Sequence, residues 1–310
     1  TVASIISELG YSVHIVQGSS EFRPSWFPAD ELDFKSIGIN DFSYKNLDPT
    51  FDIVVIPETF LPLLPKLSHL KVVIFNQNMH YLFGEKMNLD PSFVFRSYSL
   101  PNILSVWTVS ASDYSYAIDT LPIPPSRVFR IVNAVESGLF SFSFSTNKSI
   151  AYMPRKNESH SRIVVDLIKN QSWFRDSGWS FHPIINKSLA EVSEILHDSS
   201  IFLSFGYPEG FGLPLAEAII SGCLLVGYDG IGGSEISDLC KPFDVFTSVS
   251  FRDFHSFVKG VHNALTAYDH SNQQKLRSRL LQASMLTASR YSPDSMTESL
   301  SSIMRSLASL

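Results

Sequence analysis

Two glutamates and two glycines in the second half of the chain could together bind a ligand that carries both phosphates and hydroxyls. Glu209 and Glu217 enclose the run Glu209-Gly-Phe-Gly-Leu-Pro-Leu-Ala-Glu217. A carboxylate accepts hydrogen bonds from hydroxyl groups. Gly210 and Gly212 carry no Cβ, so a ligand can approach the main chain closely. These residue types favour a binding segment over a plain turn.

The residues around this run predict a strand, a loop, a helix and a second strand. Residues 201–205 are apolar and 206–212 are rich in Gly and Pro, which predicts a buried strand and then a loop. Pro214 suits the start of a helix and Gly222 its end, before a second strand at 223–226. In such units ligands bind beyond the carboxyl ends of the strands, where helix N-termini bind phosphates. A nucleotide sugar, with phosphates between two polyols, has the matching shape.

The motif resembles the donor-site signature of retaining glycosyltransferases of the GT-B fold, and is most similar to the GT4 group (glycosyl transferases group 1). The resemblance covers Glu209 to Glu217, Gly222 behind them, and Gly232-Gly-Ser-Glu235 after the next strand. It implies an α/β protein with two Rossmann-like, doubly wound parallel-sheet domains that face a cleft. An ordinary βαβ turn with two solvated glutamates would explain the glycines, but not Glu209, Phe211 and Pro214 together.

Alternating strands and helices in both halves predict the same two-domain arrangement. We expect an N-terminal acceptor domain over residues 1–136, a Ser- and Phe-rich linker over 137–148, and a nucleotide-sugar donor domain over 149–290. The resemblance implies that the last helix, within 291–310, packs back on the N-terminal domain. It also implies a first strand before the helix predicted at 2–9. No such strand is present, so the chain is shortened there or has lost this opening.

Cations follow the first predicted strand of the donor domain. Arg155 and Lys156 come directly after the strand predicted at 149–153, where positive charge would neutralise a departing diphosphate. Similar proteins carry an Arg and a Lys in this loop about five positions apart, whereas here the two are adjacent. Arg155 is the leading phosphate ligand, and its partner could be Lys156, His160 or Arg162. A solvated pair of loop cations remains the alternative.

Polar residues at strand ends of the first half are acceptor-side candidates. Asn78 and His80 follow the strand predicted at 71–75, and His80 could hydrogen-bond a sugar hydroxyl or be an ordinary loop histidine. Ser110 and Asn133 end two later strands and could equally well cap or brace their loops.

The resemblance assigns roles to these residues. The helix start at Gly212 to Leu215, with Arg155, would bind the diphosphate, and Glu217 the ribose hydroxyls. Glu209 and the amides of 210–212 would hold the donor sugar. The catalytic candidates are Glu209, Arg155 and Lys156, and the donor-binding candidates are Gly210, Phe211, Gly212, Leu213 and Glu217. The leaving phosphate would take the acceptor proton, so no side-chain base is required.

Other functions stay open at this point. A GT-B epimerase would need no acceptor, and a GT-B phosphorylase would use phosphate. A non-catalytic nucleotide-sugar-binding protein or a truncated fragment would bind without transfer. We predict no metal, because no Asp-x-Asp follows an apolar strand; residues 30–33 are the nearest approach. Cys223 and Cys240 read as buried small hydrophobes.

Composition excludes some partners. The net charge is −6, which argues against broad nucleic-acid binding. No apolar run approaches the roughly 20 residues of a membrane span, and no signal peptide is visible, so we predict a cytoplasmic protein. Peripheral membrane contact stays open, because many similar enzymes use lipid-linked acceptors. The nucleotide base, the sugar, the acceptor and the oligomeric state are not determined by the sequence.

Overall fold

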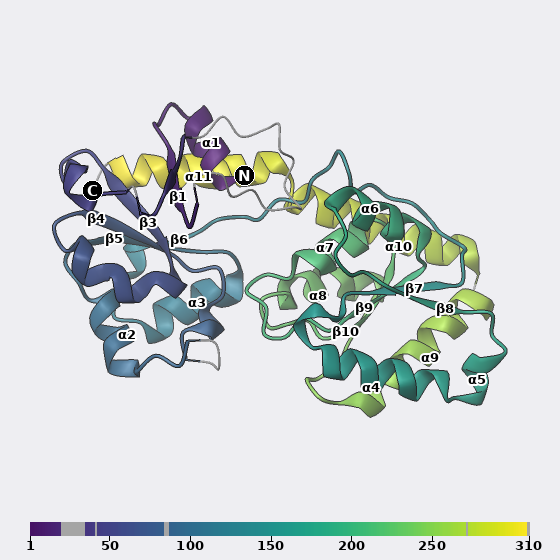
Figure 1. Ribbon diagram of the computed structural model, residues 1–310. Helices are drawn as coiled ribbons and strands as arrows, with labels where there is room; N and C mark the ends of the chain where they lie inside the picture. Colours follow the sequence, from purple (N-terminus) through teal and green to yellow (C-terminus); the bar gives the residue numbers. More distant parts are fainter. Residues whose placement is uncertain (20–34, 41, 84–86, 271, 309–310) are drawn as a thin grey trace. The chain divides into compact units, whose positions relative to one another are not determined.

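The computed structural model describes residues 1–19, 35–40, 42–83, 87–270 and 272–308 (Figure 1). The chain divides into two compact units. The N-terminal unit comprises Thr1–Val132 and Met296–Leu310, and the C-terminal unit comprises Asn133–Ser295.

The N-terminal unit contains two parallel sheets. The larger has the order β3 (Ile53–Pro57), β4 (Lys71–Phe75), β5 (Ile103–Thr108) and β6 (Val128–Arg130). The smaller pairs β1 (His14–Gln17) with β2 (Lys35–Gly38). The sequence analysis missed β2, because its four residues contain no apolar run. The helices of this unit are α1 (Val2–Glu8), α2 (Pro91–Tyr98), α3 (Ala111–Thr120) and α11 (Pro293–Ala308).

The sequence predicts a helix from residue 58 to about 67, after β3, and the structure has a different kind of helix there. Residues Glu58–Leu67 form a 3-10 helix, η2, with Pro62 and Pro65 inside it. A proline lacks the N–H that an α-helix interior needs, so the chain takes the tighter form. The buried leucines Leu61, Leu64 and Leu67 recur every third residue, which matches the 3-10 repeat and fixes η2 on the core.

The C-terminal unit is a doubly wound parallel sheet. Its order is β11 (Phe246–Ser248), β10 (Leu224–Gly227), β9 (Ile201–Ser204), β7 (Ser149–Tyr152) and β8 (Ser180–Pro183). The chain winds one way from β7 to β8 and the other way from β9 onward. The switch point therefore lies between β7 and β9, which is where such sheets bind ligands.

Helices cover both faces of this sheet (Figure 1). One face carries α4 (Glu158–Lys169), α5 (Ser172–Arg175) and α9 (Phe254–His270), and the other carries α6 (Leu189–Asp198), α7 (Leu213–Ile220), α8 (Ser234–Cys240) and α10 (Gln273–Arg290). The sequence also predicts a strand at 243–246. The observed strand begins later, because Lys241–Phe243 form a 3-10 turn and β11 starts at Phe246.

Residues 137–148, predicted as a linker, lie within the C-terminal unit and hydrogen-bond to residues of its helices and helix ends. The Ser143 N–H donates to Ser221 O at 3.2 Å, and Ser193 Oγ donates to Leu139 O at 2.6 Å. A Cβ on Gly222 would lie 2.3 Å from Ser143 O, so only glycine fits there. The last helix groups with the N-terminal unit, where the Val132 N–H donates to Ser299 Oγ at 3.1 Å.

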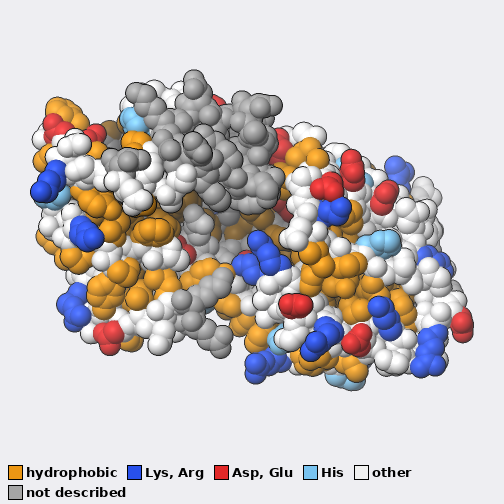
Figure 2. Space-filling model, in the orientation of Figure 1, with side chains coloured by type: hydrophobic (Ala, Val, Ile, Leu, Met, Phe, Trp, Pro, Cys, Tyr) orange, Lys and Arg blue, Asp and Glu red, His pale blue; other side chains and the backbone are white. Residues whose placement is uncertain are grey.

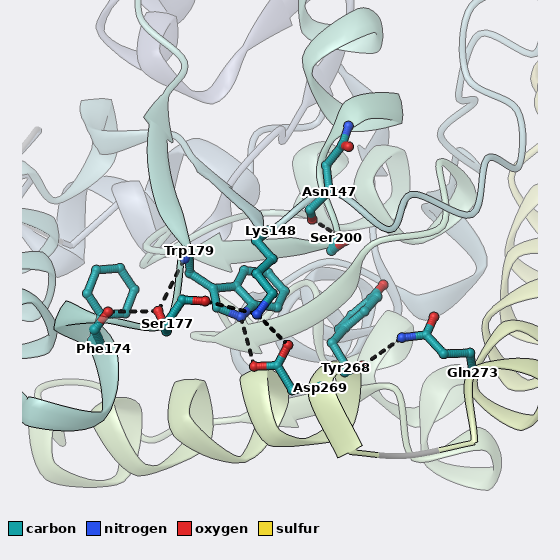
Figure 3. Close-up of polar contacts among 9 residues, drawn as sticks. All are labelled: Asn147, Lys148, Phe174, Ser177, Trp179, Ser200, Tyr268, Asp269 and Gln273. Atoms are coloured by element: carbon teal, nitrogen blue, oxygen red, sulfur yellow. Dashed lines mark hydrogen bonds and ion pairs between the residues drawn. The ribbon is translucent and has the colours of Figure 1, made fainter.

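Polar groups pair with one another at the amino-terminal edge of the C-terminal sheet (Figure 3). Lys148 Nζ lies 3.0 Å from Asp269 Oδ1, and Trp179 Nε1 donates to Asp269 Oδ2 at 3.3 Å. Ser200 Oγ donates to Asn147 O at 2.6 Å. The two contacts of Asp269 tie α9 to residues that directly precede β7 and β8.

Candidate functional site

The loops at the switch point of the C-terminal sheet carry the predicted donor-site residues. The loop after β7 contains Arg155 and Lys156, and the loop after β9 contains Glu209 and leads into α7. Because β7 and β9 are paired neighbours, the two loops leave the same edge of the sheet side by side. The sequence had placed these residues on separate strand ends, and the topology brings them together.

Helix α7 begins with unused backbone donors. Gly212 occupies the N-cap with φ 89°, a left-handed conformation that favours glycine. Among the described residues, no hydrogen bond is made by the N–H groups of 210–213. Helix N-termini with free N–H groups attract anions. The far end of α7 is closed by Gly222, as predicted: the Cys223 N–H donates to Ala218 O at 2.9 Å.

A second glycine-rich loop supports the first through backbone contacts. The Glu209 N–H donates to Gly230 O at 2.7 Å, and the Gly232 N–H donates to Glu209 O at 3.1 Å. A Cβ on Gly232 would lie 2.0 Å from Gly210 O. The glycines after β10 are therefore required by the close approach of the two loops.

The Glu209 side chain lies in a slot between two glycines. A Cβ on Gly206 would lie 2.7 Å from Glu209 Oε1, and a Cβ on Gly230 would lie 2.8 Å from Glu209 Cβ. The carboxylate projects from this slot to Lys156, whose Nζ is 3.0 Å from Glu209 Oε2. The Lys156 and Glu209 side chains are 29% and 17% exposed, so the ion pair is partly open to solvent.

The three other cation candidates differ in how exposed they are. Arg155 is exposed, at the 3-10 turn Pro154–Lys156, and Arg162 is exposed on α4. His160 is buried: its Nδ1 lies 3.1 Å from the Tyr228 hydroxyl, and its ring contacts Phe251. Burial, with a further effect of Arg252, lowers the pKa of His160. A packed, neutral histidine is a poor partner for a phosphate, and Lys156 is the cation that reaches Glu209.

Glu217 is a buried carboxylate on α7. It is 9% exposed, and no hydrogen bond or ion pair to its carboxylate is found among the described residues. Burial raises its pKa to about 7. A buried charge without a partner is costly, so this group would gain from a ligand that donates hydrogen bonds to it.

Two of the donor-binding candidates have different surroundings. The Phe211 ring is 4% exposed and packs edge-on against Tyr291, with ring centres 4.8 Å apart. Phe211 therefore anchors the loop to α10, and only its backbone can reach a ligand. Leu213 is 39% exposed at the start of α7. Gly210 and Gly212 are buried in the loop.

In the N-terminal unit, Glu58 holds the loop after β4, and sequence reasoning missed this role. Its carboxylate accepts hydrogen bonds from the N–H of Gln77 at 3.0 Å and of Asn78 at 3.2 Å. Burial raises the pKa of Glu58, and the two backbone hydrogen bonds oppose that change. The polar residue directly after an apolar strand was the signal available in the sequence.

The acceptor-side candidates differ in whether their side chains already have hydrogen-bond partners. Asn78 is buried, and its Oδ1 accepts from the His80 N–H at 3.1 Å, so it braces the loop. Burial lowers the pKa of His80, and its buried Nε2 has no partner among the described residues. Ser110 caps α3 by accepting from the Asp113 N–H at 3.0 Å. Asn133 is half-buried and is the first residue of the C-terminal unit.

The described residues contain no group of three or more His, Cys, Asp or Glu side chains placed to hold a metal ion, and metal independence stays a prediction. Within the same described parts, no helix is long and apolar enough to cross a membrane. On the face drawn in Figure 2, Lys and Arg side chains alternate with acidic and hydrophobic ones.

Comparisons with protein-family models and with curated proteins found no match. Solved structures do match. Sucrose-phosphate synthase from Thermosynechococcus elongatus has 10% identity and a TM-score of 0.70, over 99% of this chain and 92% of that one. WaaG, a glycosyltransferase involved in lipopolysaccharide biosynthesis, has 13% identity and a TM-score of 0.62, over 97% and 94%.

TarM from S. aureus, solved in complex with fondaparinux, alpha-GlcNAc-glycerol and UDP, has 15% identity and a TM-score of 0.60. The match covers 82% of this chain and 55% of TarM, so the chain spans about half the length of TarM. These neighbours are GT-B glycosyltransferases, and the chain has their fold, with two Rossmann-like units.

Proposed function

We propose that the protein is a retaining glycosyltransferase that moves a sugar from a nucleotide-diphosphate donor to a hydroxyl acceptor. The observation that carries the proposal is the buried Glu217 carboxylate, which has no partner among the described residues. It lies on α7, and the loop that leads into α7 contains Glu209, which pairs with Lys156. A carboxylate that can accept hydrogen bonds from hydroxyls, amides that can bind phosphate, and a cation all lie near one switch point, which supports a nucleotide-sugar donor site. UDP is the first nucleotide to test, because the TarM complex contains it.

Each part of the donor has a proposed partner. The diphosphate binds the amides of 210–213 and the cations Arg155 and Lys156, which stabilise the charge that develops on the leaving group. The ribose hydroxyls donate to the ionised carboxylate of Glu217. Glu209 and the neighbouring amides orient the donor sugar. In the N-terminal unit, His80 stays an acceptor-side candidate, with a ring Nε2 that has no hydrogen-bond partner among the described residues.

The reaction then needs positioning and electrostatic stabilisation more than a side-chain base. The bond between the sugar C1 and the phosphate oxygen breaks, and a bond from C1 to the acceptor oxygen forms on the same face. The acceptor proton passes to the departing phosphate oxygen. Configuration at C1 is retained, and nucleoside diphosphate is the second product.

A binding panel followed by a transfer assay tests this proposal. Thermal shifts with UDP, GDP, ADP and TDP, each with and without EDTA, should show stabilisation by one base that EDTA leaves unchanged. The sugar conjugate of that nucleotide should then release nucleoside diphosphate only when an acceptor is added. A phosphorylase would instead require phosphate, and an epimerase would convert the donor without an acceptor.

Glu217→Gln and the matched control Glu194→Gln sharpen the panel. Both remove one glutamate charge from the same unit, but Glu194 is exposed on α6. The first variant should lose most of the thermal shift and the second should keep it. No shift with any nucleotide in the wild-type protein would contradict the proposed function.

A further inference from the structure

Asn157 connects the two loops of the candidate donor site through its side chain. It follows Lys156 directly, and its Nδ2 donates to Phe205 O at 2.7 Å and to Tyr207 O at 3.0 Å. These two carbonyls flank Gly206 in the loop after β9. One side chain on the β7 loop thus uses both of its amide hydrogens on the β9 loop.

The Asn157 side chain does not make the capping hydrogen bond that is usual at its position. Asn157 occupies the N-cap of α4, a position where asparagine usually accepts a hydrogen bond from the first turn of the helix. Here no side-chain capping bond is present. Because the usual capping bond is not made, this local conflict points to a function of Asn157 outside its own helix.

The clamped segment determines where the Glu209 carboxylate lies. Gly206, between the two clamped carbonyls, forms one wall of the slot that holds Glu209, with the position of its missing Cβ only 2.7 Å from Glu209 Oε1. Lys156, the residue before Asn157, reaches Glu209 Oε2 at 3.0 Å. The two loops are therefore joined by a neutral clamp and by a charged pair.

We propose that Asn157 is a positioning residue of the donor site, whose side-chain amide holds the Glu209 loop in register with Lys156. The inference rests on the proposed function. When a diphosphate competes with Glu209 for Lys156, the charged connection between the loops weakens and the neutral one persists. Asn157 then keeps the slot of Glu209 and the N-terminus of α7 in place while the charges rearrange.

The test compares Asn157→Ala with a matched variant in the other unit. Asn102 is also half-buried and also clamps two carbonyls, since its Nδ2 donates to Leu67 O at 3.0 Å and Leu70 O at 2.9 Å. Asn102→Ala removes the same groups far from the donor loops in sequence. Asn157→Gln, which restores an amide donor one methylene further out, serves as the conservative variant and as a second variant should the alanine protein fold poorly.

Two measurements separate positioning from simple bracing. We expect Asn157→Ala to increase hydrogen exchange in residues 205–212 and to raise the Kd for UDP about tenfold, with Asn157→Gln in between. Asn102→Ala should lower the Tm about as much as Asn157→Ala does. It should leave the hydrogen exchange of residues 205–212 and the Kd for UDP unchanged. An unchanged Kd and unchanged exchange in Asn157→Ala would overturn the inference.

The hydrogen-exchange and UDP-binding measurements also distinguish this inference from the proposed function. If the wild-type protein binds no UDP or other nucleoside diphosphate, the proposed function fails. The exchange measurement still decides whether Asn157 holds the loop, because it needs no ligand. Equal exchange in 205–212 for all three variants and the wild type would then contradict the clamp.

Discussion

Each unit of the molecule buries a glutamate, Glu58 directly after β3 and Glu217 within α7, and the two carboxylates differ in what surrounds them. Glu58 accepts two backbone hydrogen bonds from the loop after β4. Glu217 has no hydrogen bond or ion pair from the described residues, and burial raises its pKa to about 7. A satisfied buried carboxylate stabilises the architecture, whereas an unsatisfied one indicates a place for a ligand.

The largest expected effect concerns Glu209, the carboxylate that is exposed enough to exchange partners. Glu209→Gln should reduce sugar transfer about 10²- to 10³-fold, a loss typical of removing one group that stabilises the transition state. The Kd for UDP should instead fall severalfold, because Lys156 no longer has a competing carboxylate. Steady-state transfer assays and UDP titrations measure both. Unchanged turnover would remove Glu209 from the mechanism.

Disturbing the contact between the loops after β9 and β10 should weaken UDP binding. Gly232→Ala places a Cβ 2.0 Å from Gly210 O and should weaken UDP binding at least tenfold, because the loop before α7 must move. Gly138→Ala is the control, since its Cβ would meet only Glu136 Oε1 at 3.5 Å. Equal UDP affinities for the two alanine variants would show that the loop contact does not shape the site.

The two buried glutamates should respond oppositely to amidation. Glu58→Gln should destabilise the protein by about 1–3 kcal/mol, because the new NH₂ faces a backbone N–H that has lost its acceptor. Denaturant unfolding at pH 8 measures this. A Glu58→Gln protein as stable as the wild type would contradict the assignment of Glu58 as a structural clamp.

For Glu217→Gln, the change in the free energy of unfolding relative to the wild type depends on pH. The pKa of Glu217 is raised in the folded state, so its favourable contribution is complete in acid and is lost as the pH rises to about 7. Relative to the wild type, Glu217→Gln should gain about 2–3 kcal/mol between pH 5 and pH 8, at about 1.4 kcal/mol per pH unit. Parallel stability curves for variant and wild type would show that the carboxyl is not desolvated.

Much of the donor segment could be predicted from the sequence, because its signals are local. The apolar run of β9, the glycines of the loop, Pro214 and Gly222 lie within a single stretch and specify strand, loop and helix in turn. Most of the order of helices and strands followed from the same patterns, but β2 and the 3-10 form of η2 did not.

Contacts between distant residues were not predictable. Glu58 meets the loop after β4 across 19 positions, and Asn157 meets the β9 loop across 48 positions. Glu58 stands out only as a polar residue directly after an apolar strand, and neither its type nor that of Asn157 indicates which distant loop it meets. The pairing of Lys156 with Glu209, and the burial of His160 against Tyr228, likewise depend on strand order and helix packing.

The most direct test of the account is a calorimetric titration of UDP into the wild type and Glu217→Gln at pH 6, 7 and 8. If ribose hydroxyls bind the ionised Glu217, affinity of the wild type should fall about tenfold from pH 8 to pH 6, because one proton must leave a group with a pKa of about 7. The variant should bind more weakly and show only the pH dependence of UDP itself. Equal affinities and parallel pH profiles in the two proteins would contradict a donor site built around Glu217.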